Sequence, residues 1–231
     1  KEIFKSNSCH DNASPGRMVP FNLENQKGLI LTISSGSYNS PSMESQDSSS
    51  IYGKTIFINL KNGEFRVFSL GHRVVQGLVS HKNKLIATEH GPRGGDEINL
   101  IKQGKNYGWP ISSLGEKYDF KYEKTPVYKK SHSDFGFEEP IFSYIPGIGI
   151  SEIIKMPENY SEMLPNVFVV SSLYGKSIFL IRFNNQFNKI LFSEKIFLNE
   201  RIRDLKYEKT NELILLAFEE NGEIGIIRKI N

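Results

Sequence analysis

The residues with the clearest capacity for chemistry lie in the segment 71–110. It reads GHRVVQGL, then ATEHGPRGGDEINLI after a gap of eight residues, then KNYGWP. The glycines of the GPRGG stretch let the backbone approach a bound group closely, because glycine has no side chain. Carbonyl oxygens exposed in such a loop suit a hard cation such as Ca²⁺, which takes several oxygen ligands. The alternative is an ordinary tight turn in which Asp96 and Glu97 are solvated.

Arginines form a second group of interest. Arg73 lies in the same segment, and Arg201 and Arg203 lie near the C-terminal end of the sequence. Residues at i and i+2 of a strand share one face, and guanidinium groups bind carboxylates in a bidentate way. Arg201 and Arg203 together would therefore suit a carboxylate ligand. The alternative is a surface ion pair of Arg203 with Asp204 or Glu200.

The elements that must position these residues are short strands. Helical periodicity is scarce, and apolar or β-branched runs recur between Gly, Asn, Asp, Ser and Pro, which indicates an all-β fold. The expected strands are residues 28–34, 54–60, 64–70, 84–89, 97–101, 166–172, 177–183, 189–198, 202–207, 212–218 and 223–230. Asn-Gly pairs at 62–63 and 221–222 predict turns between neighbouring strands.

Three of these strands share a coarse pattern that indicates a repeated unit. Residues 29–34, 85–89 and 213–218 are each predicted to be the second strand of such a unit. Sheets of about four strands repeated radially make a propeller, although a sandwich would also contain many short strands. Residues 34–50 and 104–139 lack strand periodicity and are predicted to be long loops, the first of them on the surface; such loops are usually functional or mobile.

Composition excludes several classes of function. The 231 residues are 38% hydrophobic, and 29 basic against 26 acidic side chains leave a net charge of +3. So mild a surplus argues against a nucleic-acid groove or a membrane-surface patch. No apolar stretch reaches the roughly 18–20 residues that cross a bilayer. The single cysteine, Cys9, leaves stability to packing.

In order and spacing, the segment 71–110 resembles the signature of the soluble quinoprotein aldose (glucose/sorbosone-type) dehydrogenases. Further matches are GRMV at 16–19, QD at 46–47, GK at 53–54 and RIRD at 201–204. The resemblance implies a six-bladed β-propeller that uses pyrroloquinoline quinone (PQQ) and Ca²⁺. At about 40–45 residues per blade, residues 1–231 would form a partial propeller that covers roughly the last four blades.

The resemblance also assigns roles to individual residues. The carbonyls of Gly91 and Pro92 would hold the calcium that accompanies the quinone, and Glu97 and Tyr107 would help to bind a second, structural calcium. Trp109, the only tryptophan, is expected to pack in the core. Five side chains would contact the quinone: Arg73, Gln76, Lys176, Arg201 and Arg203.

Three positions depart from the family pattern. The family's catalytic histidine, four residues before the arginine of GRMV, is replaced by Ala13, and His10 becomes the candidate base if the loop has gained residues. A surface histidine is the alternative. Val74 stands where the family has asparagine. The family's cofactor-binding lysine falls on Tyr174, and Lys176 lies two places on, on the same face if this segment is a strand.

The resemblance implies a periplasmic or secreted enzyme that oxidises an aldose to its lactone, with a sugar as small-molecule partner. The alternative is a catalytically degenerate, calcium-binding propeller that serves as a binding or scaffold module, which the changes at Ala13, Val74 and Tyr174 favour. A third possibility is a sugar-binding module that uses the aromatic residues of 118–128.

The sequence also predicts incomplete closure of the propeller. The last blade is expected to have only three strands, and the fourth strand would come from the start of an intact chain. The first blades would then precede residue 1 or be carried by another polypeptide. An open ring would leave unpaired strand edges and an exposed apolar face.

Overall fold

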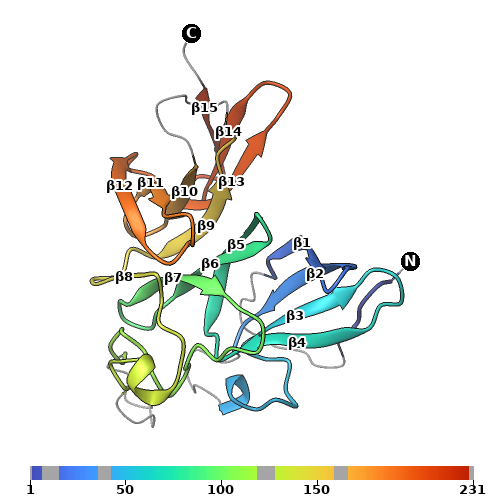
Figure 1. Ribbon diagram of the computed structural model, residues 1–231. Helices are drawn as coiled ribbons and strands as arrows, with labels where there is room; N and C mark the ends of the chain where they lie inside the picture. Colours follow the sequence, from blue (N-terminus) through green and yellow to red (C-terminus); the bar gives the residue numbers. More distant parts are fainter. Residues whose placement is uncertain (1, 7–15, 36–42, 119–127, 159–165, 229–231) are drawn as a thin grey trace.

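The computed structural model describes residues 2–6, 16–35, 43–118, 128–158 and 166–228, which form four antiparallel sheets in succession along the chain (Figure 1). The first sheet contains β1 (Met18–Leu23), β2 (Gln26–Ile33), β3 (Lys54–Asn59) and β4 (Phe65–Leu70). The second contains β5 (Val74–His81), β6 (Lys84–His90), β7 (Asp96–Ile101) and β8 (Phe142–Tyr144). The third contains β9 (Ile150–Lys155), β10 (Val167–Ser172), β11 (Ser177–Phe183) and β12 (Ile190–Phe197). The last contains β13 (Ile202–Glu208), β14 (Leu213–Phe218) and β15 (Ile224–Arg228).

Tight turns join consecutive strands within each sheet. Glu24 and Asn25 form the turn between β1 and β2 with φ angles of 51° and 64°. Such a two-residue turn with positive φ matches the right-handed twist of the strands it joins. The turns predicted at 62–63 and 221–222 are confirmed, since Gly63 and Gly222 have φ angles of 77° and 69° between paired strands.

The first strand of every sheet lies on the inside of an arc of sheets, and the last strand lies outside (Figure 1). β5 contacts both β1 and β9, and β9 contacts β13. Apolar clusters fill the space between successive sheets, with Phe57 and Leu85 in the first cluster, Ile98 and Phe168 in the second, and Val169 and Leu205 in the third. Each sheet buries its apolar faces against its neighbours, as the blades of a β-propeller do.

Most of the predicted strands are confirmed. Residues 29–34, 85–89 and 213–218 fall in β2, β6 and β14, which are the second strands of their sheets. The last sheet has three strands among the described residues. β1, β5 and β9 were not predicted, although they line the centre. β5 carries the polar Gln76 and β9 carries the polar Ser151 and Glu152 at buried positions, so no apolar–polar alternation marks these two strands. β1 contains Pro20, and a proline within a run counts against a strand.

The two long loops are only partly as predicted. No strand occurs between β7 and β8 in the described residues 102–118 and 128–141, where the short helix η2 (Ser133–Phe135) lies. The loop before β3 contains the short helix η1 (Met43–Ser45), and it is exposed as predicted at Met43, Glu44 and residues 47–49, but buried at Ser34, Ser35 and Ser45. Ser45 is fully buried, because the Lys54 ammonium group donates to the carbonyls of Glu44, Ser45 and Tyr52 at 2.7, 3.1 and 2.7 Å. No helix among the described residues is long and apolar enough to span a membrane.

Candidate functional site

The site is built where the inner strands begin. Arg73 immediately precedes β5, Arg201 immediately precedes β13, and β6 ends at His90. Burial is the main reason that the pKa of His90 falls to about 4, and the positive charges of Arg73 and Arg203 lower it further against the opposing effect of Asp96. The two predicted arginines 73 and 203 therefore act on the same imidazole, although they come from sheets two apart in the ring.

Arg73 is held from its backbone and from its side chain. Its backbone N–H donates to Glu89 Oε1, and its carbonyl accepts from Ser35 N–H at 2.7 Å. Its guanidinium lies 5.2 Å from the centre of the Trp109 ring, and Nη1 donates to the His90 carbonyl at 3.3 Å. Only 5% of Arg73 is exposed. A buried guanidinium in this setting is preorganised to bind an anionic group.

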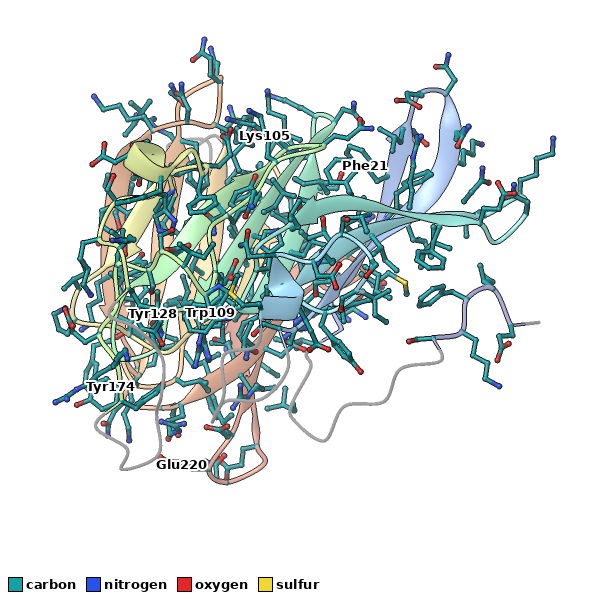
Figure 2. The ribbon with its side chains drawn as sticks, turned by 90° about the horizontal axis from the view of Figure 1, so that it is seen from below. Phe21, Lys105, Trp109, Tyr128, Tyr174 and Glu220 are labelled. Atoms are coloured by element: carbon teal, nitrogen blue, oxygen red, sulfur yellow. The ribbon has the colours of Figure 1, made fainter. Side chains whose placement is uncertain are left out.

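Two buried polar atoms beside Arg73 have no hydrogen-bond partner among the described residues. They are Nε2 of His90 and Nε1 of Trp109. Buried polar atoms are nearly always paired in native proteins, so two orphans next to a buried arginine fit a site for a polar ligand. Figure 2 shows Trp109 beside Tyr128, and the two ring centres are 5.3 Å apart. Trp109 is buried, as expected for a packing residue.

Arg201 and Arg203 share one acidic partner. Arg201 contacts Glu219 Oε2 through Nη2 at 2.6 Å, and Arg203 Nη2 contacts Glu219 Oε1. Burial raises the pKa of Glu219, but the hydrogen bonds from Arg203 and Arg201 outweigh this and leave the pKa lowered. The two side chains share this carboxylate although Arg201 precedes β13 and Arg203 lies at the irregularity of β13 between Ile202 and Asp204, where strand alternation is interrupted. The sequence offered Asp204 or Glu200 as a surface ion-pair partner for Arg203. The structure shows Glu219 in that role, just beyond β14.

Of the other predicted site residues, Gln76 lies on a strand and Lys176 lies in a turn. Gln76 is buried in β5, three residues beyond Arg73. Lys176 does not lie on a strand, so the predicted common strand face with Tyr174 is wrong. Gly175 and the positive φ of Lys176 (46°) make a turn between β10 and β11, and Lys176 Nζ lies 3.8 Å from Glu220. His10 and Ala13 lie outside the described residues.

Beneath Arg73 lies a chain of buried polar side chains that sequence reasoning missed. His72 Nδ1 is 3.0 Å from Glu89 Oε2, and Glu97 Oε2 accepts from Asn99 Nδ2 at 3.0 Å. Glu97 Oε1 is 3.2 Å from His132 Nε2. Burial raises the pKa of Glu97, and for His132 the interaction with Glu97 outweighs burial and raises its pKa as well. No spacing rule links residue 132 to residue 97, so the pair could not be found from the sequence.

The four predicted calcium ligands lie close together, and Pro92, Glu97 and Tyr107 have protein partners. Gly91, Glu97 and Tyr107 line one small cavity of about 10 Å³, whereas the Pro92 carbonyl accepts from the Tyr118 hydroxyl at 2.5 Å. The Tyr107 hydroxyl donates to the Leu100 carbonyl at 2.5 Å. Among the described residues, no group of three or more His, Cys, Asp or Glu side chains is arranged to hold a metal. Glu97 and Tyr107 remain a predicted position for a second calcium, at which the Glu97 carboxylate is bonded to Asn99 and the Tyr107 hydroxyl to Leu100.

Replacement of Ser112 with alanine tests the buried polar chain. The Ser112 hydroxyl lies 2.7 Å from His132 Nδ1, and its loss leaves a buried ring nitrogen unpaired. We expect the free energy of unfolding, measured by urea denaturation, to fall by about 1–3 kcal/mol. Ser49→Ala removes an exposed serine hydroxyl that bonds to Asp47 and should change stability by less than about 0.5 kcal/mol. Equal stabilities of the two variants would contradict the network.

A second polar cluster lies between the inner strands of the four sheets, and the sequence did not reveal it. Arg17, just before β1, reaches Gln76 of β5, Glu152 of β9 and Asp204 of β13. Burial raises the pKa of Glu152 to about 8, although Arg17 acts in the opposite direction. The GRMV match had marked Arg17 only as part of a resemblance. Its partners lie 59 to 187 residues away.

Comparison with known sequences gives a consistent family. The family described as "Glucose / Sorbosone dehydrogenase" matches residues 1–228. Aldose sugar dehydrogenase YliI of Escherichia coli is 30% identical over 178 residues, which cover 73% of this chain and 45% of that protein. An uncharacterized protein of Synechocystis, slr1608, is 32% identical over 161 residues, covering 68% of this chain and 38% of that protein. The chain thus spans less than half the length of these two relatives.

Solved structures show the same fold. The soluble aldose sugar dehydrogenase of E. coli in its apo form has a TM-score of 0.79 at 24% identity, covering 94% of this chain and 65% of that one. A PQQ-bound aldose sugar dehydrogenase of Streptomyces coelicolor has a TM-score of 0.61 at 21% identity, covering 89% and 58%. Since the family match extends over nearly every residue, this chain belongs to the glucose/sorbosone dehydrogenase family of sugar dehydrogenases.

Proposed function

We propose that this chain is part of a PQQ-dependent aldose dehydrogenase, which oxidises the anomeric hydroxyl of a sugar to a lactone. The observation that carries the proposal is the buried guanidinium of Arg73, which lies beside two buried polar atoms, His90 Nε2 and Trp109 Nε1, that have no hydrogen-bond partner among the described residues. PQQ carries three carboxylates, and a buried guanidinium beside unpaired polar atoms fits such a ligand. The S. coelicolor aldose sugar dehydrogenase of the same fold has a PQQ-bound form.

The residues of this chain would bind and orient the cofactor and the sugar. Bound PQQ would supply the acceptor for the hydride from the anomeric carbon, which is chemistry that side chains cannot provide. Arg73 would hold a carboxylate in a fixed position, because Glu89 and Ser35 fix its backbone. His90, with its low pKa, would stay neutral beside the two arginines and offer a hydrogen bond without adding charge. His10 is the proposed base for the sugar hydroxyl.

Arg201, Gln76 and Lys176 complete the proposed cofactor contacts. Arg201 and Arg203 are already neutralised in part by Glu219, so a carboxylate of the ligand would have to compete with that side chain. Calcium at the Gly91 and Pro92 carbonyls is proposed on the resemblance alone. For the same reason we propose a periplasmic or secreted location and a six-bladed ring, with further blades contributed by chain outside residues 1–231.

Addition of PQQ with Ca²⁺ tests the proposed function. We expect the chain to bind PQQ, seen as a shift of melting temperature that grows with PQQ concentration. We also expect glucose or another aldose to reduce a dye when PQQ is bound. A rise in melting temperature with Ca²⁺ and none with PQQ would instead identify a calcium-binding scaffold. No response to either addition would exclude both functions for this chain.

A further inference from the structure

We propose that Arg17 is a positioning residue that locks the ligand-facing ends of the four inner strands together and fixes the direction of Gln76. The guanidinium of Arg17 makes one contact with each of the other three inner strands. Nε donates to the Gln76 carbonyl of β5, and Nη1 lies 2.6 Å from Glu152 Oε2 of β9 and 3.1 Å from Asp204 Oδ2 of β13. The effect of Arg17 on PQQ binding rests on the proposed function. The effect of Arg17 on the packing of the four inner strands, here called the lock, does not.

The backbone of Arg17 is itself anchored, so its side chain starts from a fixed point. Its N–H donates to the Thr32 hydroxyl at 3.0 Å, and its carbonyl accepts from the Thr32 N–H at 2.9 Å. Thr32 lies in β2 and is buried. Four-fifths of the Arg17 side chain is also buried. The guanidinium therefore ties the inner strands of the other three sheets to the first sheet.

The contact with β5 falls at an irregularity of that strand. Val75 pairs with Glu89 and Gly77 pairs with Thr88, so Gln76 is an extra residue with no partner on β6. A bulge of this kind redirects a side chain and leaves its own backbone groups outside the ladder. The Arg17 Nε–H satisfies the Gln76 carbonyl. The bulge and the held carbonyl together constrain the direction in which the Cα–Cβ bond of Gln76 leaves the strand.

The neighbouring glycine shows how close the strands are at this point. A Cβ atom on Gly77 would lie 2.6 Å from the Ile153 nitrogen and 2.8 Å from Glu152 Oε1. β5 and β9 can approach this closely only because residue 77 has no side chain. The bulge thus lies directly against Glu152, whose Oε2 is 2.6 Å from Arg17 Nη1. The close approach of β5 and β9 and the contact between Arg17 and Glu152 therefore occur at the same point.

Arginine is the residue type that this position requires. Its planar fork offers five donors and keeps its charge at every accessible pH. A lysine ammonium is a compact point charge, and from the same backbone position it would not reach the Gln76 carbonyl and two carboxylates in one geometry. Arg17→Lys is therefore expected to behave as a weakened lock, and Arg17→Met as a lost one.

The test compares Arg17→Met and Arg17→Lys with the control Arg66→Met in the full chain. Arg66 lies in β4 of the same sheet and makes one exposed ion pair, with Glu24 at 2.8 Å. Two quantities are measured: the dissociation constant for PQQ, and the amide hydrogen exchange of residues 74–78, 150–153 and 202–205. We expect Arg17→Met to weaken PQQ binding by about tenfold or more and to speed exchange in all three segments. The control should change neither quantity.

The two measurements separate the lock from the proposed function. If the wild-type chain does not bind PQQ, the proposed function fails. Amide hydrogen exchange alone then tests whether Arg17 holds the inner strands together. Exchange in Arg17→Met that matches Arg66→Met would overturn the proposal. If Arg17→Met does not fold, Arg17→Lys takes its place, with smaller changes expected in the same direction. Wild-type affinity and wild-type exchange in Arg17→Lys would show that the fork is not needed, and the proposal would be wrong.

Discussion

Replacement of Arg73 with methionine is expected to weaken the binding of PQQ by about 10- to 100-fold. Hydrogen bonds to charged groups contribute about 1.5–3 kcal/mol each, and Arg73 is the most deeply buried of the three arginines proposed to bind the ligand. Its backbone bonds to Glu89 and Ser35 do not depend on the side chain. The variant should therefore keep its loop conformation and lose only the guanidinium.

The fluorescence of Trp109 provides the measurement. It is the only tryptophan in the chain, and the Arg73 guanidinium lies 5.2 Å from its ring, so a ligand on Arg73 should quench it. Arg66→Met makes the same substitution at an exposed ion pair and should bind PQQ as the wild type does. Arg73→Lys serves if the methionine variant is unstable. Unchanged affinity in both Arg73 variants would remove Arg73 from the site.

The second large effect concerns Glu152 and pH. Burial raises the pKa of Glu152 from 4.5 to about 8 in the folded protein, against the effect of Arg17. Between these two values the folded state keeps a proton that the unfolded state has lost. Its contribution to stability is therefore complete below about pH 4.5 and is lost as the pH rises through about 8. Over that window we expect the free energy of unfolding to fall by about 1.4 kcal/mol per pH unit on account of this residue.

Urea denaturation of the wild type and of Glu152→Gln, from about pH 5 to about pH 9, measures this contribution. Other groups titrate in both proteins, so the quantity of interest is the difference between their stabilities. Asp204, the other acidic partner of Arg17, is present in both. Glu24→Gln is the control, because the pKa of Glu24 is lowered by its exposed bond to Arg66. A pH-independent difference between wild type and Glu152→Gln would contradict the raised pKa.

The outer parts of the fold could be predicted from the sequence. The strand expected at 177–183 coincides with β11, and those at 54–60 and 212–218 differ from β3 and β14 by one residue. These strands are β-branched or aromatic runs bounded by turn residues, and their pairing is local. The inner strand β5 was missed because its polar residue Gln76 occupies a buried position, and β1 was missed because Pro20 interrupts its apolar run.

The glycine-rich segment and the arginines were likewise recognisable, but their partners were not. The residue types and the spacing of Arg201 and Arg203 predicted a shared face, and both side chains do reach one carboxylate. That carboxylate, Glu219, is 16 residues from Arg203 along the chain and adjacent only because β13 pairs with β14. Lys176 was placed on a strand because the turn at Gly175 was not recognised.

By itself the sequence determined that the chain is all-β and where most of its outer strands lie, and it proposed glycines and arginines for the site. These features depend on side-chain type and on local turn residues, which a pattern can record. Only the tertiary structure decided that Arg17 meets Gln76, Glu152 and Asp204, and that Glu97 meets His132. Those contacts join separate sheets and loops, and they exist only after apolar burial has packed the sheets around one axis.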